Sequence, residues 1–214
     1  MKKIALISVF CILLTGCSKD KFHYPDALTN LVEADTDNQG NLKLIRTDEG
    51  EAFKPSTSVL LKDATPDSTY RVLCMYQPLE HSQADIYKMN GILCSSNPIA
   101  IEDLKEDDLL SNDPVKLTSI WCSSKYVNLR LGVMTKDEEK QIFRFILTGK
   151  HTTAGGQQAF HLQLSHDQNN DPEAYTKDCY LSCPLKTLEP QKGDSIYFTL
   201  HTYEGVSTTG FQIK

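Results

Sequence analysis

The sequence predicts an all-β protein, built as a small OB-like β-barrel followed by an Ig-like antiparallel β-sandwich. Short strand segments separated by turn residues recur through the first hundred residues. In the second half, apolar and polar side chains alternate with a period of two, as in half-buried strands. No long segment carries the apolar spacing of an amphipathic helix.

The first half contains five strand segments, which we place at residues 28–34, 41–47, 51–54, 70–76 and 86–94. Residues 35–40 and 48–50 separate the first three and are rich in Asp, Asn and Gly, which accept the backbone angles of turns. Five short strands packed this closely along the chain suit a small closed barrel of the OB type.

The second half alternates more regularly. Val127, Leu129 and Leu131 share one face, and Tyr126 and Asn128 share the other. The same pattern recurs at residues 143–147, 160–164, 179–183, 196–200 and 211–213, and residues 115–120 add another strand. Because each strand has one apolar face, two antiparallel sheets packed on those faces make a sandwich.

A segment rich in breakers and acids separates the two halves. Residues 101–110 are the one short helical candidate, and Pro98 and Pro114 lie on either side of it. We therefore expect the barrel at 26–100, a linker at 101–113 and the sandwich at 114–214.

The N-terminus has the three parts of a bacterial lipoprotein signal. Lys2 and Lys3 precede an apolar run at 4–14 that is too short to span a bilayer, and small residues then lead to Cys17. We expect residues 1–16 to be removed, acyl chains such as palmitate to be attached through Cys17, and residues 17–25 to form a tether. Three chains would hold the protein in the membrane.

Ser18, not an aspartate, follows the lipidated cysteine, which indicates export to the outer membrane. The tether leaves open whether the protein faces the periplasm or the cell surface. The formal charge of −6 becomes −8 once Lys2 and Lys3 are removed. Such an acidic chain lacks the basic footprint of a nucleic-acid-binding protein.

Five cysteines remain after the signal and the lipid site are set aside: Cys74, Cys94, Cys122, Cys179 and Cys183. Cys74 and Cys94 lie on consecutive strand segments and could form a disulfide, or all five could be small buried hydrophobes. No pair of cysteines or histidines has the spacing of metal ligands, so we expect no metal and no cofactor.

After the lipidation motif, a series of segments follows in a distinctive order: residues 31–37, 42–44, the turn at 48–50, 101–104, 126–131 and 160–167. This order resembles the NigD-like family of lipoproteins from gut and oral anaerobes. The resemblance covers about residues 26–214 and implies an N-terminal OB-like barrel followed by a C-terminal β-sandwich. It implies no site residues, because the family has no established site.

The residues that could support catalysis or calcium binding form no complete motif. His151, His161 and His166 have no nucleophile motif near them, so we expect no enzymatic role. Four oxygen-bearing residues resemble a calcium loop: Asp167, Asn169, Asp171 and Asp178. Pro172 stands where such a loop turns at glycine, which favours a plain polar loop.

Aromatic side chains are the candidate binding residues, because OB barrels and sandwiches bind ligands across faces and loops. Trp121, Tyr126, Tyr175 and Tyr203 are the ones we select, after also considering Tyr76 and Tyr87. The sequence therefore predicts a non-enzymatic envelope lipoprotein that binds a protein or a glycan. The alternative is an immunity-like or inhibitor protein that captures an exported toxin or protease.

Overall fold

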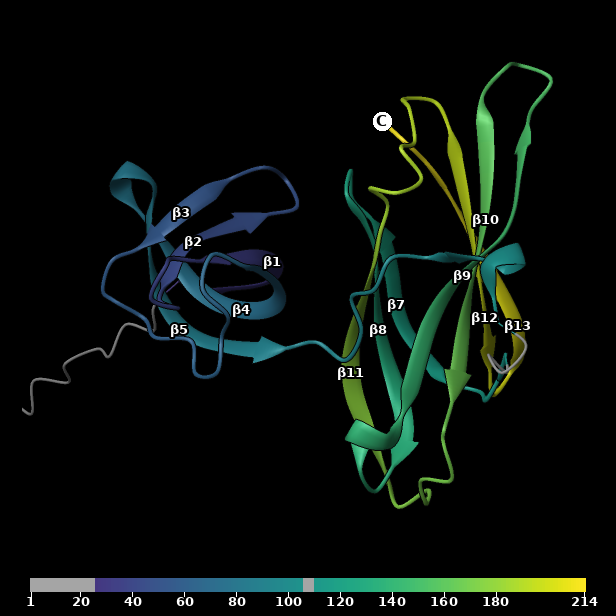
Figure 1. The fold of residues 1–214 in the computed structure, drawn as a ribbon, viewed down its shortest axis with the longest axis horizontal. Helices are drawn as coiled ribbons and strands as arrows, with labels where there is room; N and C mark the ends of the chain where they lie inside the picture. Colours follow the sequence, from purple (N-terminus) through teal and green to yellow (C-terminus); the bar gives the residue numbers. More distant parts are fainter. Residues whose placement is uncertain (1–25, 106–109) are drawn as a thin grey trace, which may run out of the picture.

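A computed structural model describes residues 26–105 and 110–214, and within them it shows a closed β-barrel beside a two-sheet sandwich (Figure 1). The only helical elements in that part of the chain are three short 3-10 turns: η1 (Glu80–Ser82), η2 (Ile101–Asp103) and η3 (Glu138–Lys140). The predicted all-β fold class is confirmed. No helix in this part of the chain is long and apolar enough to cross a membrane. Cys17 and the rest of the predicted signal and tether lie outside the described residues.

The barrel contains five strands: β1 (Leu28–Thr36), β2 (Leu42–Thr47), β3 (Ala52–Pro55), β4 (Thr69–Leu79) and β5 (Gln83–Gly91). Their order around the barrel is β1-β2-β3-β5-β4, closed by antiparallel pairing of β4 with β1. The parallel pairing of β3 with β5 completes the ring. Its core is made by the inward side chains Val32, Ala34, Ile45, Cys74 and Tyr76.

The sandwich contains eight strands: β6 (Ile99–Ala100), β7 (Lys116–Cys122), β8 (Tyr126–Thr135), β9 (Ile142–Thr152), β10 (Gln158–Asp167), β11 (Tyr175–Pro184), β12 (Ser195–Thr202) and β13 (Gly205–Gln212). One sheet has the order β13-β12-β10-β9-β6 and the other has the order β11-β8-β7. The alternating apolar residues of both sheets form a single core. Figure 1 shows the three-stranded sheet next to the barrel and the five-stranded sheet on the far side.

The structure differs from the sequence prediction at three points, two in the pairing of strands and one in the segment at 101–110. β6 pairs in parallel with β9, so residues 99 and 100, which we assigned to the end of the barrel, lie in a sandwich sheet. The pairing of β10 with β12 is also parallel, within an otherwise antiparallel layout. The helical candidate at 101–110 begins only as the turn η2, whose first residues have no side-chain cap, and residues 106–109 lie outside the described part. The expected division at 26–100, 101–113 and 114–214 stays a prediction.

The suggested disulfide between Cys74 and Cys94 is wrong, because both cysteines are free. Cys74 is buried in the barrel core, whereas Cys94 packs against the core of the sandwich. Burial raises the pKa of Cys74 and Cys122 to about 11 and that of Cys179 to about 12. Thiols with such pKa values stay protonated at neutral pH and behave as small hydrophobes.

Candidate functional site

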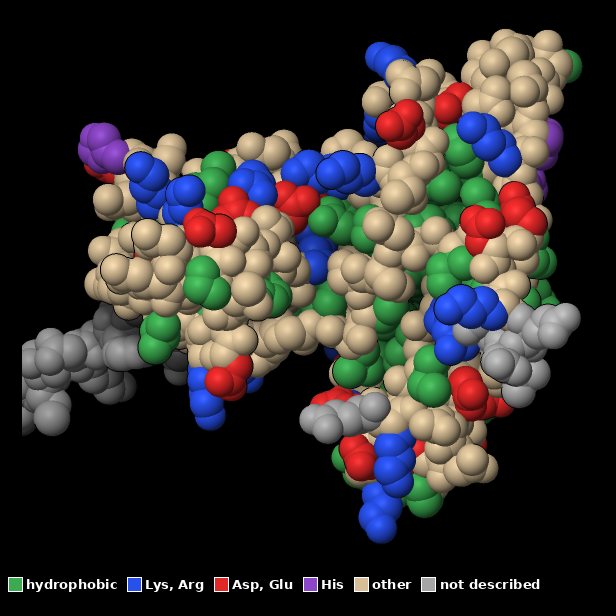
Figure 2. All heavy atoms as spheres, viewed as in Figure 1, with side chains coloured by type: hydrophobic (Ala, Val, Ile, Leu, Met, Phe, Trp, Pro, Cys, Tyr) green, Lys and Arg blue, Asp and Glu red, His purple; other side chains and the backbone are tan. Residues whose placement is uncertain are grey.

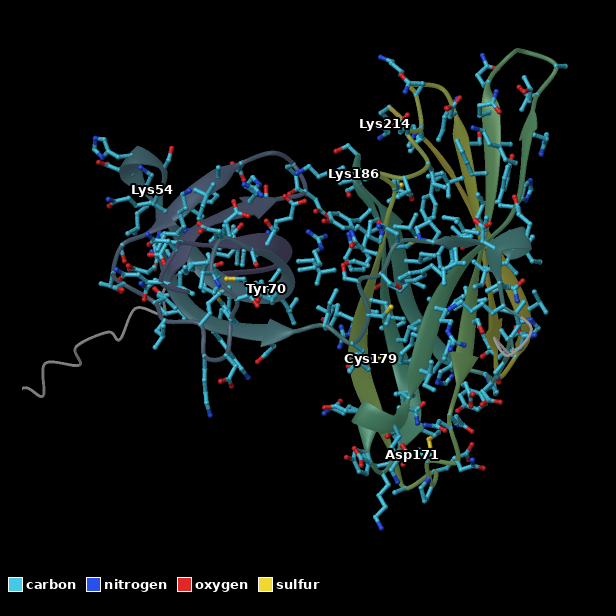
Figure 3. The ribbon with its side chains drawn as sticks, in the orientation of Figure 1. Lys54, Tyr70, Asp171, Cys179, Lys186 and Lys214 are labelled. Atoms are coloured by element: carbon cyan, nitrogen blue, oxygen red, sulfur yellow. The ribbon has the colours of Figure 1, made fainter. Side chains whose placement is uncertain are left out.

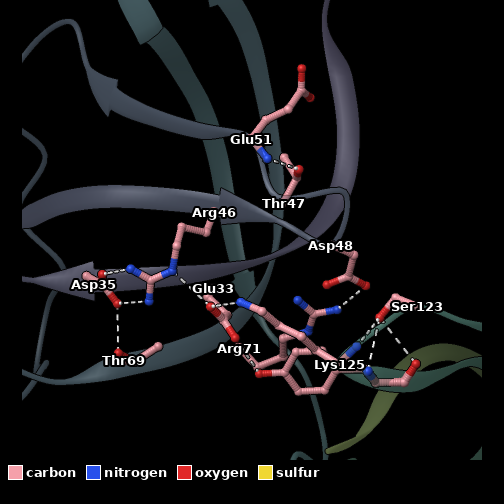
Figure 4. Close-up of polar contacts among 11 residues, drawn as sticks. Glu33, Asp35, Arg46, Thr47, Asp48, Glu51, Thr69, Arg71, Ser123 and Lys125 are labelled. Carbon is pink, nitrogen blue, oxygen red and sulfur yellow. Dashed lines mark hydrogen bonds and ion pairs between the residues drawn. The ribbon is translucent and has the colours of Figure 1, made fainter. Parts of the chain in front are cut away.

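Arg71 of β4 joins the barrel to the sandwich, with a side chain that is only 2% exposed. Its Nη2 donates to Asp48 Oδ2 at 2.8 Å and to Asn128 Oδ1 at 3.1 Å. Its Nε donates to Ser182 Oγ at 3.2 Å. Figure 4 shows the guanidinium reaching the Asp48 carboxylate, which lies just after β2. Because Asn128 and Ser182 belong to β8 and β11, one side chain connects three strands of two domains.

The two sandwich residues at this junction also bond to each other and to the acid. Ser182 Oγ donates to Asn128 Oδ1 at 2.7 Å, and Asn128 Nδ2 donates to Asp48 Oδ2 at 2.9 Å. Asn128 and Ser182 are fully buried. A buried ion pair is stable only when further hydrogen bonds satisfy its remaining polar atoms, and this network supplies them for Arg71 Nε, Arg71 Nη2 and the Asp48 carboxylate.

Glu33 of β1 makes a second connection beside the first. It accepts hydrogen bonds from Arg46 Nε and Lys125 Nζ, each at 3.0 Å, and from the Tyr126 hydroxyl at 2.9 Å. Burial alone would raise the pKa of Glu33, but the hydrogen bonds from Lys125, Arg46 and Tyr126 hold it below its ordinary value. Figure 2 shows acidic and basic side chains interleaved on the barrel face that adjoins the sandwich. The Glu33 carboxylate therefore stays ionised at neutral pH.

A groove with a volume of about 570 Å³ runs between these two connections, with walls from both domains. The Arg71 guanidinium carbon lies 4.0 Å from the centre of the Tyr126 ring, so the groove floor is a cation–π pair. Arg71 Nη1 is buried and has no hydrogen-bond partner among the described residues. Burial, followed by the hydrogen bond to Glu33, raises the pKa of Tyr126 to about 12. The groove thus offers cations and a protonated phenol, which suit binding, and holds no activated nucleophile among these groups.

A second hollow of about 280 Å³ lies where Trp121 meets the barrel. Trp121 is 37% exposed, and Arg130 and Tyr180 of the sandwich and Asn30 of the barrel share the lining. The barrel itself carries a larger cavity, of about 630 Å³, between β4, β5 and the loop at residues 59–64. Tyr87 lines that cavity and donates its hydroxyl to Gln77 Oε1 at 2.7 Å.

The structure does not bring the four predicted binding residues together. Tyr126 lies in the groove and Trp121 in the hollow beside it. Tyr203 is 51% exposed at the turn between β12 and β13, and Tyr175 is 52% exposed at the start of β11. A single aromatic groove is therefore not formed by these residues, and a binding role for each stays a prediction. Of the two other aromatics considered, Tyr76 is fully buried in the barrel core.

His166, one of the catalytic candidates, is a core residue with 2% exposure. Its Nε2 lies 2.7 Å from Gln141 Oε1, its Nδ1 lies 3.0 Å from the carbonyl oxygen of Asp113, and its ring stacks on Phe143. Burial lowers the pKa of His166. Both ring nitrogens and one face of the imidazole are therefore engaged in contacts within the core, and these contacts account for a histidine at this position.

His151 and His161, the other catalytic candidates, form a surface row with Tyr197. The ring centres are 5.2 Å apart at each step, across β9, β10 and β12. Tyr197 had not been selected from the sequence. The alternating pattern could have placed Tyr197 on the outer face of its strand, because Ile196 and Phe198 on either side of it are apolar. The pattern within one strand does not show which strands lie beside it, so the row with His151 and His161 could not be predicted.

Asp171, one of the residues of the calcium-like loop, is buried at the end of the sandwich opposite to Lys214 (Figure 3). Its carboxylate accepts hydrogen bonds from the Thr135 hydroxyl, from Gln141 Nε2 and from the backbone N–H groups of Lys136 and Asp137. The protein itself therefore supplies the donors that fix this anion. Asp178 lies apart from it and pairs with Arg130 at 2.6 Å.

Stability at low pH should depend on Asp171. Burial would raise its pKa, but the hydrogen bonds from Thr135, Gln141 and the two backbone amides lower it to about 2. The unfolded value is about 3.9, so the stabilisation is complete above pH 4 and is lost as the pH falls towards 2. We expect the melting temperature of the wild type to fall more steeply between pH 4 and 2 than that of Asp171→Asn, measured by circular dichroism. Asp178→Asn is the matched control and should keep the wild-type slope, and equal slopes in all three proteins would contradict the assignment.

The central residues of the interface between the domains, Arg71, Asp48 and Asn128, were missed by sequence analysis. Arg71 lies on the face of β4 opposite to its apolar face, and Asn128 lies on the polar face of β8. A residue on such a face is expected to contact solvent. The signal that could have marked them is weak, since a polar strand face covered by another domain has the same pattern as a solvent-exposed one.

Residues 97–213 match the family described as the NigD-like C-terminal beta sandwich domain. The chain belongs to the NigD-like family. The resemblance inferred from the sequence is thereby confirmed. No curated protein matches the chain significantly.

Solved structures extend the NigD-like likeness to both domains. A NigD-like immunity protein from Bacteroides caccae shares 25% identity with a TM-score of 0.67, covering 89% of this chain and 94% of that one. A protein from Parabacteroides distasonis described as toxin-related shares 15% identity with a TM-score of 0.69, covering 87% and 93%. A candidate lipoprotein from Bacteroides fragilis shares 12% identity with a TM-score of 0.61, covering 89% and 99%. The last two show the fold alone.

Proposed function

We propose that this protein is a non-enzymatic lipoprotein of the outer membrane that binds an exported protein, in an immunity-like or accessory role. The observation that carries the proposal is the likeness to the NigD-like immunity protein, which extends over the barrel and the sandwich together. The buried network around Arg71 supports it, because it holds the two domains as one recognition unit. In the groove, the lowered pKa of Glu33 and the raised pKa of Tyr126 keep the carboxylate ionised and the phenol protonated, as suits binding.

Capture in the native envelope tests this function. The lipidated protein carrying an affinity tag is cross-linked in intact cells, and each enriched exported protein is purified and titrated against it by calorimetry. We expect one exported protein to bind with 1:1 stoichiometry. Failure of every enriched protein to bind after purification would sink the proposal.

Membrane attachment through Cys17 is proposed on the signal at residues 1–17. Cys17→Ser removes the thiol that carries the lipid, so the variant should move completely from the detergent phase to the aqueous phase in a Triton X-114 partition. Ser18→Ala, the adjacent control, should stay in the detergent phase. Retention of Cys17→Ser with the membrane proteins would refute the lipid assignment, and protease treatment of whole cells then distinguishes the surface from the periplasm.

A glycan is the second candidate ligand, favoured by the hollow at Trp121. An exposed indole beside Arg130 and Asn30 combines a stacking surface with hydrogen-bonding groups, as sugar sites do. A glycan array probed with the wild type and with Trp121→Ala tests this alternative. Binding that is lost in the variant would support it, and an array without binding would remove it.

A further inference from the structure

The edge strand β13 is unprotected, which sets it apart from the other strand edges of the sandwich. Its eight residues contain no charged side chain and no proline, and they pair with β12 without a register shift. On its other side, β13 has no strand neighbour among the described residues. Native proteins usually block such an edge with charges, prolines or bulges, because it offers a template for another strand.

The other three edges are each blocked. β6 is only two residues long, and the residues of β9 that it leaves uncovered include the charged Arg144 and Lys150. β7 begins with Lys116 and has a register shift between Leu117 and Ser119. β11 carries Lys177 and Asp178, and the chain at residues 93–94 exchanges backbone hydrogen bonds with its residues 180 and 182. The barrel is closed and has no edge. The absence of protection is therefore specific to β13.

The backbone groups that β13 leaves free can be assigned. Ile213, directly after the strand, donates its N–H to the carbonyl of Asp194 and so faces β12. In an antiparallel ladder, alternate residues direct both backbone groups to the same neighbour. Hence Ser207, Thr209 and Phe211 bond towards β12, and Val206, Thr208 and Gly210 direct their N–H and C=O groups to the open edge.

A cavity of about 420 Å³ adjoins this edge where β13 begins. It lies between the two edge strands β7 and β13 and is lined by Val115, Lys116, Leu117, Tyr203, Glu204 and Val206, with other residues of the turn. Val206 is 64% exposed there, and Phe211 and Leu117 are only partly buried against the core. The open side of the sandwich thus combines free strand hydrogen bonds with a side-chain pocket whose lining is mixed, apolar at Val115, Leu117 and Val206 and charged at Lys116 and Glu204.

We propose that β13 is a docking strand, which an extended, uncharged segment of a partner protein joins as a further β-strand while placing one side chain in the adjoining cavity. This inference rests on the proposed function. It adds the conformation in which the partner is recognised, an extended strand. In strand addition, the backbone provides affinity and pockets provide specificity. The absence of charge along β13 selects a segment without charge, because a buried unpaired charge is costly.

A second copy of the chain fits this edge less well than such a segment. A two-fold pairing that keeps the core faces aligned and overlaps nearly the whole strand sets Val206 against Gly210 or Gln212, neither of which offers an apolar side chain. The large apolar side chain that a second β13 could bring is Phe211, which packs against its own core.

Residue-resolved amide exchange tests the proposal with a defined probe. The probe is a peptide copying residues 195–202, the uncharged strand that already pairs with β13 on its inner side. In the full mature protein, the amides of Val206, Thr208 and Gly210 should exchange about tenfold more slowly when the peptide is bound. Those of Thr209 and Phe211 should be protected with or without it.

Two variants and a control make the result specific. Val206→Lys places a charge on the edge, and Thr208→Pro removes an outward N–H while sparing the ladder to β12; each should weaken peptide binding at least about tenfold. Leu60→Lys, equally an exposed apolar residue but on the barrel, should bind as the wild type does. Unchanged exchange at the three outward amides, or loss of protection at Thr209 and Phe211 through strand exchange, would overturn the proposal.

Three further outcomes separate this inference from others. If sedimentation shows a wild-type dimer that Val206→Lys dissolves, the occupant of the edge is a second copy, and the docking proposal is wrong. If the exported partner found by envelope capture binds Val206→Lys as tightly as the wild type, the edge is not its site, although the proposed function stands. If the peptide protects the outward amides but no exported partner exists, the edge assignment holds and the proposed function fails.

Discussion

Replacing Arg71 with alanine is expected to lower the free energy of unfolding by about 3–5 kcal/mol, the usual cost of removing one partner of a buried ion pair. The cost arises because the substitution leaves a buried carboxylate without its cationic partner. The Asp48 carboxylate, whose side chain is 8% exposed, would be left with only the Asn128 amide as a hydrogen-bond partner. The cation–π contact with Tyr126 would also be lost.

Urea unfolding followed by fluorescence measures this cost, because the single tryptophan, Trp121, lies beside the interface between the domains. Arg130→Ala is the matched control. Its partner Asp178 is 53% exposed, so water and salt screen that pair and we expect no measurable change. An equal loss in both variants would show that the Arg71 network does not hold the domains together.

Replacing Phe198 with alanine should destabilise the sandwich by about 3–5 kcal/mol, through lost apolar burial and the cavity left behind. Phe198 on β12 is fully buried, and its ring centre lies 6.1 Å from that of Phe145 on β9. Leu162 pairs with it in register and would not fill the space, because β10 is fixed by pairing on both sides.

The neighbour of Phe198 provides the control within the same strand. Tyr197 points to the other face and is 39% exposed, so Tyr197→Ala should cost less than about 1 kcal/mol. Both variants are compared by urea unfolding followed by far-ultraviolet circular dichroism. Similar losses for the two variants would mean that the alternating pattern does not report which face of β12 is the core.

The fold could be predicted because alternation is a local property of a strand. Val127, Leu129 and Leu131 are fully buried, as their shared phase predicts, and Phe160, Leu162 and Leu164 follow the same rule. The pattern fails at Asn128, whose polar phase predicts solvent. The barrel covers that face of β8, so Asn128 is fully buried and hydrogen-bonded to Asp48.

The aromatic candidates show the same limit. Tyr76 and Tyr87 could be weighed equally from the sequence, yet the first is the largest side chain in the barrel core and the second is 45% exposed. Composition marks aromatic residues as suitable for binding, but exposure depends on neighbours that are distant along the chain. For that reason, selecting Trp121, Tyr126, Tyr175 and Tyr203 yielded residues at separate places on the molecule.

The sequence by itself determined the all-β class, the OB-like barrel followed by a sandwich, and the family, because strand periodicity and the order of motifs are written along the chain. Only the tertiary structure decided that Arg71, Asp48 and Asn128 meet, that Cys74 and Cys94 lie in different cores, and that β13 is an open edge. The physical reason is that each of these depends on which strands and which domains lie side by side. Residues as far apart as Arg71 and Ser182, 111 positions along the chain, are brought together by packing, and no local pattern encodes that pairing.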